Sequence, residues 1–96
     1  MTGDETVTST VVWEGIEIEV TYAAASVLGR AHLELRTKDK AKIPVTDTGY
    51  RSEFLEPGRV EEEGGPEAYT LAWLNHMAQS REWKDHVQRS RQLSLF

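Results

Sequence analysis

Three polar residues with complementary chemistry lie close together between positions 47 and 51. Asp47 supplies a carboxylate, Tyr50 a phenol and Arg51 a guanidinium, and such a trio can orient a small polar substrate. A turn explains the same residues structurally, because Asp47 would cap it, Gly49 would supply a positive φ angle and Tyr50 would pack. Asp47, Tyr50 and Arg51 are therefore a possible ligand site, with a structural turn as the alternative.

The three histidines do not form a metal-binding pattern. His32 falls on the polar face of an expected strand, while His76 and His86 fall on two expected helices without the H-E-x-x-H spacing. The chain has no cysteine, so disulfides and thiolate zinc sites are excluded. It also contains no phosphate loop, nucleophile elbow or paired carboxylates on a helical face. We expect no metal, no cofactor and no catalytic residue.

Charge is unevenly distributed along the chain. Arg36, Lys38, Lys40 and Lys42 alternate, so on an extended segment they would share a face that could meet phosphate, but charges also commonly protect strand edges. We favour the second interpretation, because charges on strand edges are routine. Separately, a net charge of -5 argues against a dedicated nucleic-acid binder. The acidic run 61–63 is interpreted as a solvated loop or helix end. No direct nucleic-acid binding is expected.

The last residues of the sequence, Arg91 to Phe96, read RQLSLF and place apolar side chains behind a polar stretch. Residues 1–80 carry 7 Lys and Arg against 14 Asp and Glu, whereas residues 81–96 carry 4 against 2, a local net charge of +2. An exposed apolar cluster generally has a partner. The alternatives are that these leucines complete the protein's own core or a homodimer.

The segment from Gln92 to Phe96 resembles the pentapeptide with which bacterial proteins dock on the DNA-polymerase sliding clamp. All five positions, Gln92-Leu93-Ser94-Leu95-Phe96, agree with that motif. The resemblance implies that Gln92 makes polar contacts at the pocket edge and that Leu93 packs between subsites. Leu95 and Phe96 would fill the deep apolar subsite, with Ser94 as a spacer.

Two basic residues precede the motif. Arg89 and Arg91 would steer the segment toward an acidic surface, an effect on association rate that salt weakens. The body of the chain, through VTDTGYRSEF and GGPEAYTLAWL, resembles small proteins encoded on bacterial plasmids and integrative elements.

The first half of the chain has the two-residue period of strands. The segment 10–22 predicts a hairpin around Glu14-Gly15, and 31–37 predicts a further strand with alternating inward and outward residues. Ile43 and Val45 are expected to face inward on a short strand interrupted by a turn at Thr48-Gly49, with Pro44 at an edge.

The second half changes to a helical period. Residues 56–66 read as a connection, and Pro66 suits the first turn of a helix whose stripe includes Leu71 and Leu74. Ser80 is expected to cap a second helix, with Trp83 and Val87 as its apolar contact. The predicted fold class is α+β: a small antiparallel sheet of three to four strands followed by two helices packed on one face.

These observations divide the chain into a flexible N-terminal tail (1–9), a single α+β domain (10–88) and a flexible docking tail (89–96). We expect a monomeric, cytoplasmic, non-enzymatic adaptor or regulator that does not enter a membrane and docks on the sliding clamp, linked to replication, repair or mobile-element maintenance. The alternative is a small-ligand-binding or enzymatic domain using the turn from Asp47 to Arg51, with a structural or self-associating tail.

Overall fold

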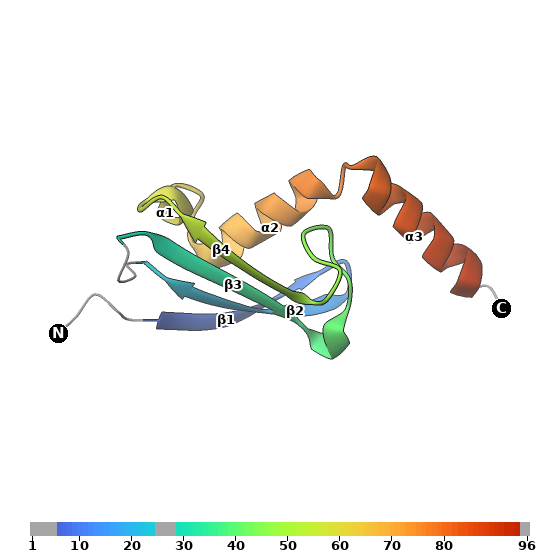
Figure 1. Cartoon of the computed structure of the whole chain (residues 1–96), viewed down its shortest axis with the longest axis horizontal. Coiled ribbons are helices and arrows are strands. Elements are labelled where there is room, and N and C mark those ends of the chain that lie inside the picture. Colours follow the sequence, from blue (N-terminus) through green and yellow to red (C-terminus); the bar gives the residue numbers. More distant parts are fainter. Residues whose placement is uncertain (1–5, 25–28, 95–96) are drawn as a thin grey trace.

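An antiparallel sheet forms the centre of the molecule, and the chain order along the sheet is β1-β2-β3-β4. A computed structural model describes residues 6–24 and 29–94, and the side chains up to residue 91 (Figure 1). The elements are β1 (Thr6–Trp13), β2 (Ile16–Ala23), β3 (Ala31–Thr37), the 3-10 turn η1 (Lys38–Lys40), β4 (Tyr50–Leu55), α1 (Arg59–Glu62), α2 (Pro66–Met77) and α3 (Arg81–Ser94). The predicted α+β class, a sheet followed by helices, is confirmed.

The hairpin of β1 and β2 turns at Glu14 and Gly15, as the sequence predicts. Both residues have positive φ angles, 49° and 82°, which is the backbone of a tight two-residue hairpin turn. Trp13 pairs with Ile16 across the turn. Along β2, buried and exposed side chains alternate: Ile18 is fully buried, whereas Glu17 and Glu19 on either side of it are exposed.

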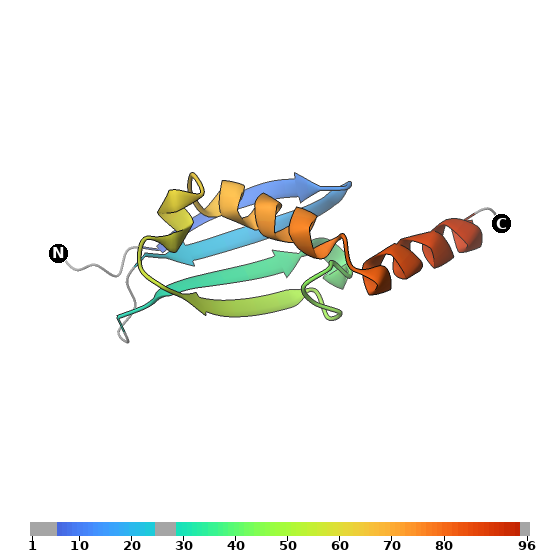
Figure 2. The same ribbon diagram turned by 90° about the horizontal axis from the view of Figure 1, so that it is seen from above.

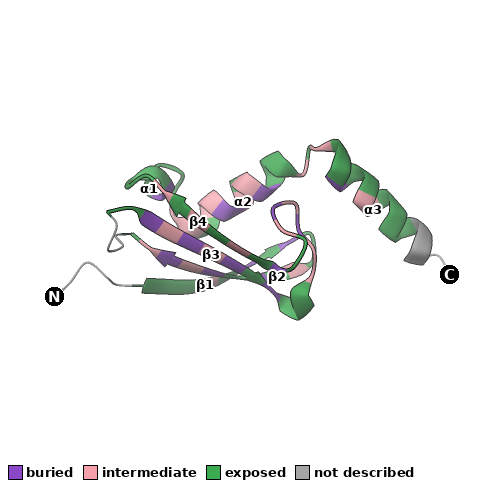
Figure 3. Ribbon diagram, in the orientation of Figure 1, coloured by how far each residue is buried: buried purple, intermediate pink, exposed green. Residues whose placement is uncertain are grey.

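The core lies between one face of the sheet and the helix α2. Figure 3 shows buried residues alternating along the strands and recurring on α2 where it meets the sheet. The buried apolar residues are Val11, Trp13, Ile18, Val20, Tyr22, Ala31, Leu33, Leu35, Ile43, Val45, Val60, Leu74 and Trp83. The opposite face of the sheet is not covered by any described element, and its Val12 and Phe54 are exposed (Figure 1).

The segment before β4 differs from its prediction. Ile43 and Val45 are buried as expected, but they do not lie on a strand. Instead, the amide of Ile43 donates to the carbonyl of Thr46 (3.1 Å), and the amide of Thr46 donates back to the carbonyl of Ile43 (3.0 Å). The backbone thus closes on itself around Pro44, and the fourth strand begins only after Gly49.

The helices begin largely where the sequence places them. Pro66 occupies the first turn of α2, and the Ser80 hydroxyl accepts a hydrogen bond from the amide of Trp83 (3.1 Å), which caps α3. The connection expected at 56–66 instead contains the short helix α1, whose Val60 is fully buried. One large apolar residue in an acidic stretch was too weak a pattern to predict it.

The helix α3 differs from the others in its position. Figure 2 shows α2 lying over the sheet and α3 continuing past its end, and the molecule measures 55 × 23 × 20 Å. Of the two helices expected on one face, α2 covers the sheet, whereas α3 meets the body at its first turns, where Trp83 is buried and Val87 is partly buried. Among the described residues, no helix combines the length and apolar character needed to cross a membrane.

Secondary structure extends beyond both ends of the domain expected at 10–88. β1 begins at Thr6, inside the segment 1–9 that was expected to be flexible, and residues 1–5 lie outside the described residues. α3 continues through Ser94, past the boundary expected at residue 88. Arginine and glutamine are good helix formers, so a solvated helix can continue without an apolar stripe.

Candidate functional site

Tyr50 and Arg51, two members of the predicted ligand trio, lie on opposite faces of β4. On the open face, the Tyr50 hydroxyl donates to Glu34 Oε2 (3.0 Å), and the guanidinium of Arg36 lies 4.9 Å from the centre of the Tyr50 ring. Neighbouring residues of a strand point to opposite sides, so these two side chains cannot converge on one small ligand.

Arg51 is engaged on the helical face. Its Nε and Nη2 donate to Glu53 Oε1 (3.1 and 2.8 Å), and its Nη1 donates to the carbonyl of Val45 (3.1 Å). The guanidinium also lies 5.5 Å from the centre of the Trp73 ring. Asp47, the third member, is 82% exposed and contacts Lys42 Nζ at 3.4 Å. The structure does not bring the trio together, and each member has a structural contact.

The three histidines lie on three different elements, β3, α2 and α3. His32 Nε2 lies 2.7 Å from the Ser52 hydroxyl, and its ring stacks on Phe54 at 4.5 Å. His86 packs near Trp83, with ring centres 5.0 Å apart. His76 lines a hollow between α1 and α2. Within the described part of the chain, no group of three or more histidine or acidic residues could hold a metal ion.

A partly buried polar contact joins β2 to α1 through Tyr22 and Glu61. The Tyr22 hydroxyl donates to Glu61 Oε2 over 2.7 Å. Burial, followed by this hydrogen bond and the negative charge of Glu61, raises the pKa of Tyr22 to about 12. The contact holds the short helix against the sheet. Little in the sequence indicated this contact, because Glu61 is one of three consecutive glutamates and nothing in the sequence distinguishes it from the other two.

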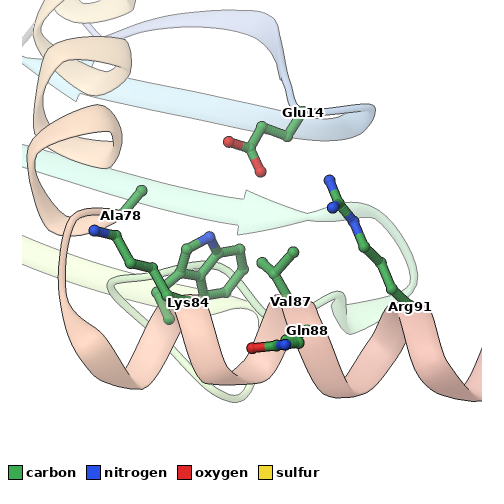
Figure 4. Close-up of a pocket in the computed structure, with 7 residues that line it drawn as sticks. Glu14, Ala78, Lys84, Val87, Gln88 and Arg91 are labelled. Atoms are coloured by element: carbon green, nitrogen blue, oxygen red, sulfur yellow. The ribbon is translucent and has the colours of Figure 1, made fainter.

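An open groove of about 470 Å³ lies between the β1–β2 turn and α3. Its lining comprises Glu14, Ala78, Trp83, Lys84, Val87, Gln88 and Arg91. In Figure 4, Val87 points into the groove from α3, while Glu14 and Arg91 approach it from the hairpin and from the far end of α3. The groove thus has an apolar floor with charged groups of both signs at its margin.

The predicted docking segment begins inside α3. Arg89 and Arg91 are exposed on this helix, and Gln92, Leu93 and Ser94 form its last residues. Leu95 and Phe96 lie outside the described residues. The backbone of α3 therefore carries the start of the segment away from the sheet (Figure 1).

Comparison with known proteins identifies the body of the chain. Residues 6–83 match the sequence profile of the KlcB third domain, which is more than half of the 96 residues. The chain belongs to the KlcB third-domain family. This family is plasmid-associated. No curated protein and no solved structure matches the chain significantly.

The extent of the KlcB match separates the chain into two parts. The matched span contains the whole sheet, α1, α2 and the start of α3, and it ends at Trp83. The rest of α3 and the pentapeptide Gln92-Leu93-Ser94-Leu95-Phe96 lie beyond it. The predicted docking segment thus lies outside the part of the chain that matches the KlcB third domain.

Proposed function

We propose that this protein is an adaptor that docks on the bacterial DNA-polymerase sliding clamp through the segment from Gln92 to Phe96. The observation that carries the proposal is the agreement of all five positions with the clamp-binding pentapeptide. The plasmid-associated family supports a role in the replication or maintenance of a mobile element in the bacterial cytoplasm.

The fold supports docking without a change in the core. The segment lies beyond the matched family domain, and α3 carries its start away from the sheet and α2 (Figure 1). The side chains that anchor α3, chiefly Trp83, are near its beginning. Binding at the far end of α3 therefore need not disturb Trp83 or the sheet.

Docking requires a local change of conformation. An extended peptide of five residues reaches roughly 16 Å, which matches a groove-bound segment better than a helical turn does. Gln92, Leu93 and Ser94 are helical in the free protein, so they would leave the last turn of α3 on binding. Helix ends fray at little cost, but ordering the segment still lowers the affinity, to about the micromolar range.

Charge supports the encounter between the two proteins. Residues 81–96 have a net charge of +2, whereas residues 1–80 have a net charge of -7. Arg89 and Arg91 stand on exposed positions of α3 immediately before the motif. Their field would orient the segment toward an acidic surface on the partner and would be weakened by salt.

Truncation tests the proposal. Purified clamp is titrated by calorimetry with the full chain and with a version that ends at Arg91. The full chain should bind with a dissociation constant of about micromolar size, and the truncated chain should not bind. Lys84→Ala, on the same helix and exposed, is the matched control and should bind like the full chain. Equal binding by the full and truncated chains would refute the proposal.

A further inference from the structure

The outer strand β1 has an unprotected edge. Its sequence, TVTSTVVW, contains no charged residue and no proline, and its register with β2 runs from Thr6 to Trp13 without a bulge. The other outer strand, β4, carries Arg51 and Glu53. Charges, prolines and bulges are the usual means by which edge strands avoid pairing with another chain. The structure shows none of them on β1.

The hairpin register determines which backbone groups of β1 point outward. Trp13 and Ile16 flank a two-residue turn and form a hydrogen-bonded pair, so every second residue back along β1 also bonds to β2. The amides and carbonyls of Thr8, Thr10 and Val12 therefore point away from the sheet. These three residues are exposed, and Figure 2 shows no described segment outside β1.

A second observation lies in the middle of the same strand. The hydroxyl oxygen of Ser9 is buried and has no hydrogen-bond partner within the described chain. A buried hydroxyl without a partner is costly, and most such groups are satisfied in native proteins. Ser9 belongs to the edge strand and pairs with Val20, so its side chain lies on the face of the sheet that carries the core.

We propose that β1 pairs with β1 of a second copy of this chain, antiparallel and across a two-fold axis at Ser9. In such a pair, the residues whose backbone groups point outward (Thr8, Thr10 and Val12) must lie opposite one another so that their amides and carbonyls can bond. A two-fold axis at Ser9, which sets Thr8 opposite Thr10, or an axis at Thr10 meets this condition and gives the greatest overlap of the two strands. The register centred on Ser9 also places two Ser9 side chains opposite each other, where Cβ atoms approach to about 4.5–5.5 Å. Rotation about χ1 then lets one hydroxyl donate to the other.

The same register is complementary along the strand. Thr8 bonds to Thr10 of the second copy, and Val7, which is 54% exposed, packs beside Val11 of the second copy. Because β1 contains no charged residue, two copies of it do not repel each other, and the strand offers no charge that would attract a charged peptide. A second copy is therefore favoured as the partner. The two sheets become one continuous sheet. This proposal replaces the monomer expected from the sequence and does not depend on clamp docking.

The mass in solution tests the dimer without any variant. Sedimentation equilibrium over rising concentration should move the mass from 10.9 kDa toward twice that value. The version ending at Arg91 should behave identically, because β1 is unchanged. A monomeric mass at all concentrations would overturn the proposal, and so would a dimer that is lost on truncation, since the tail would then hold the copies together.

A cysteine scan tests the register, and the absence of native cysteine gives a clean background. Ser9→Cys should form a disulfide-linked dimer under mild oxidation at least about tenfold faster than Val12→Cys, because Cβ atoms must approach to within about 4.5 Å. Val12 is exposed on the same strand, but the two copies of this residue stand far apart in the proposed register. Equal rates would overturn the register centred on Ser9.

A proline variant tests the use of the strand edge. The amide of Thr10 points outward, so Thr10→Pro removes a bond between copies and none to β2. The variant should remain monomeric while its circular dichroism stays that of the wild type. A folded Thr10→Pro that still dimerises would overturn edge pairing. If the variant unfolds, the masses of the wild-type and truncated chains still decide the question.

Discussion

Trp13 and Trp83 lie with ring centres 5.5 Å apart and planes inclined at 50°, where the first turns of α3 meet the β1–β2 hairpin. The indole nitrogen of Trp13 also donates to Asn75 Oδ1 on α2 over 2.9 Å. One tryptophan of the sheet therefore contacts both long helices. This arrangement fixes the start of α3 to the body and leaves its far end, with the proposed docking segment, projecting.

Trp83→Ala should release α3 from the body. Trp83 is only 7% exposed, and removing a buried tryptophan side chain typically costs about 3 kcal/mol of unfolding free energy. Hydrogen exchange should show lost protection in α3 while β2 and β3 remain protected. Lys84→Ala, at the next and exposed position, is the control and should change the unfolding free energy by less than about 0.5 kcal/mol. Unchanged protection in α3 would contradict this anchoring role.

The contact between Tyr22 and Glu61 should make stability depend on alkaline pH. The pKa of Tyr22 is about 12 in the folded protein and 10.0 as a model value, so the folded state holds this proton more tightly. The stabilisation is complete below pH 10 and is lost as the pH rises toward 12. Denaturant titrations across this range should show the decline.

Tyr22→Phe is the control for that prediction, because it keeps the ring and removes the ionisable hydroxyl. The ultraviolet titration of the three tyrosines should lose its latest step in this variant, and the extra fall in stability attributable to Tyr22 should vanish. If the latest step persists in Tyr22→Phe, the alkaline dependence arises elsewhere.

Gly49→Ala should be far more destabilising than Gly58→Ala. Both glycines have positive φ angles, 85° and 90°, so alanine pays about 1 kcal/mol of backbone strain at either position. At Gly49 the added Cβ would also lie 2.6 Å from Lys40 Cα and 2.6 Å from Thr37 Oγ1, whereas at Gly58 it would meet open space. Thermal unfolding of the two variants separates the effect of the steric clash from that of the backbone strain. Equal losses of stability in the two variants would contradict the close approach at Gly49.

The sequence predicted the elements that have a strong period of their own. The alternation from Ile16 to Tyr22, the Glu14-Gly15 turn, the Pro66 helix start and the Ser80 cap are local signals, and the structure confirms each of them. Each of these features depends on residues that are neighbours in sequence, so the amino-acid sequence alone is enough to predict it.

Other features depend on contacts between distant residues and were missed or misplaced. Ile43 and Val45 are buried, but burial alone does not distinguish a strand from the turn that the structure shows. Val60 becomes a core residue only because α1 folds over β2. By contrast, the separation of Tyr50 from Arg51 was predictable, because adjacent residues on a strand face opposite sides.

Arg89→Gln should slow association with the clamp rather than speed dissociation. Arg89 is exposed before the motif, so its charge acts at a distance during the encounter. Surface plasmon resonance at low salt should show a reduced association rate and a nearly unchanged dissociation rate. The difference from the wild type should disappear at high salt, because screening removes the attraction. A faster dissociation at every salt concentration would show that Arg89 makes a direct contact instead.

The most direct test of the central claim is a calorimetric titration of purified clamp with the full chain and with a Leu95→Ala, Phe96→Ala variant. The proposal predicts that the full chain binds and that the double variant loses at least about a hundredfold in affinity, because these two side chains supply the apolar anchor. The circular dichroism of the two proteins should be the same. Undiminished binding by the double variant, or no binding by the full chain, would contradict the proposed function.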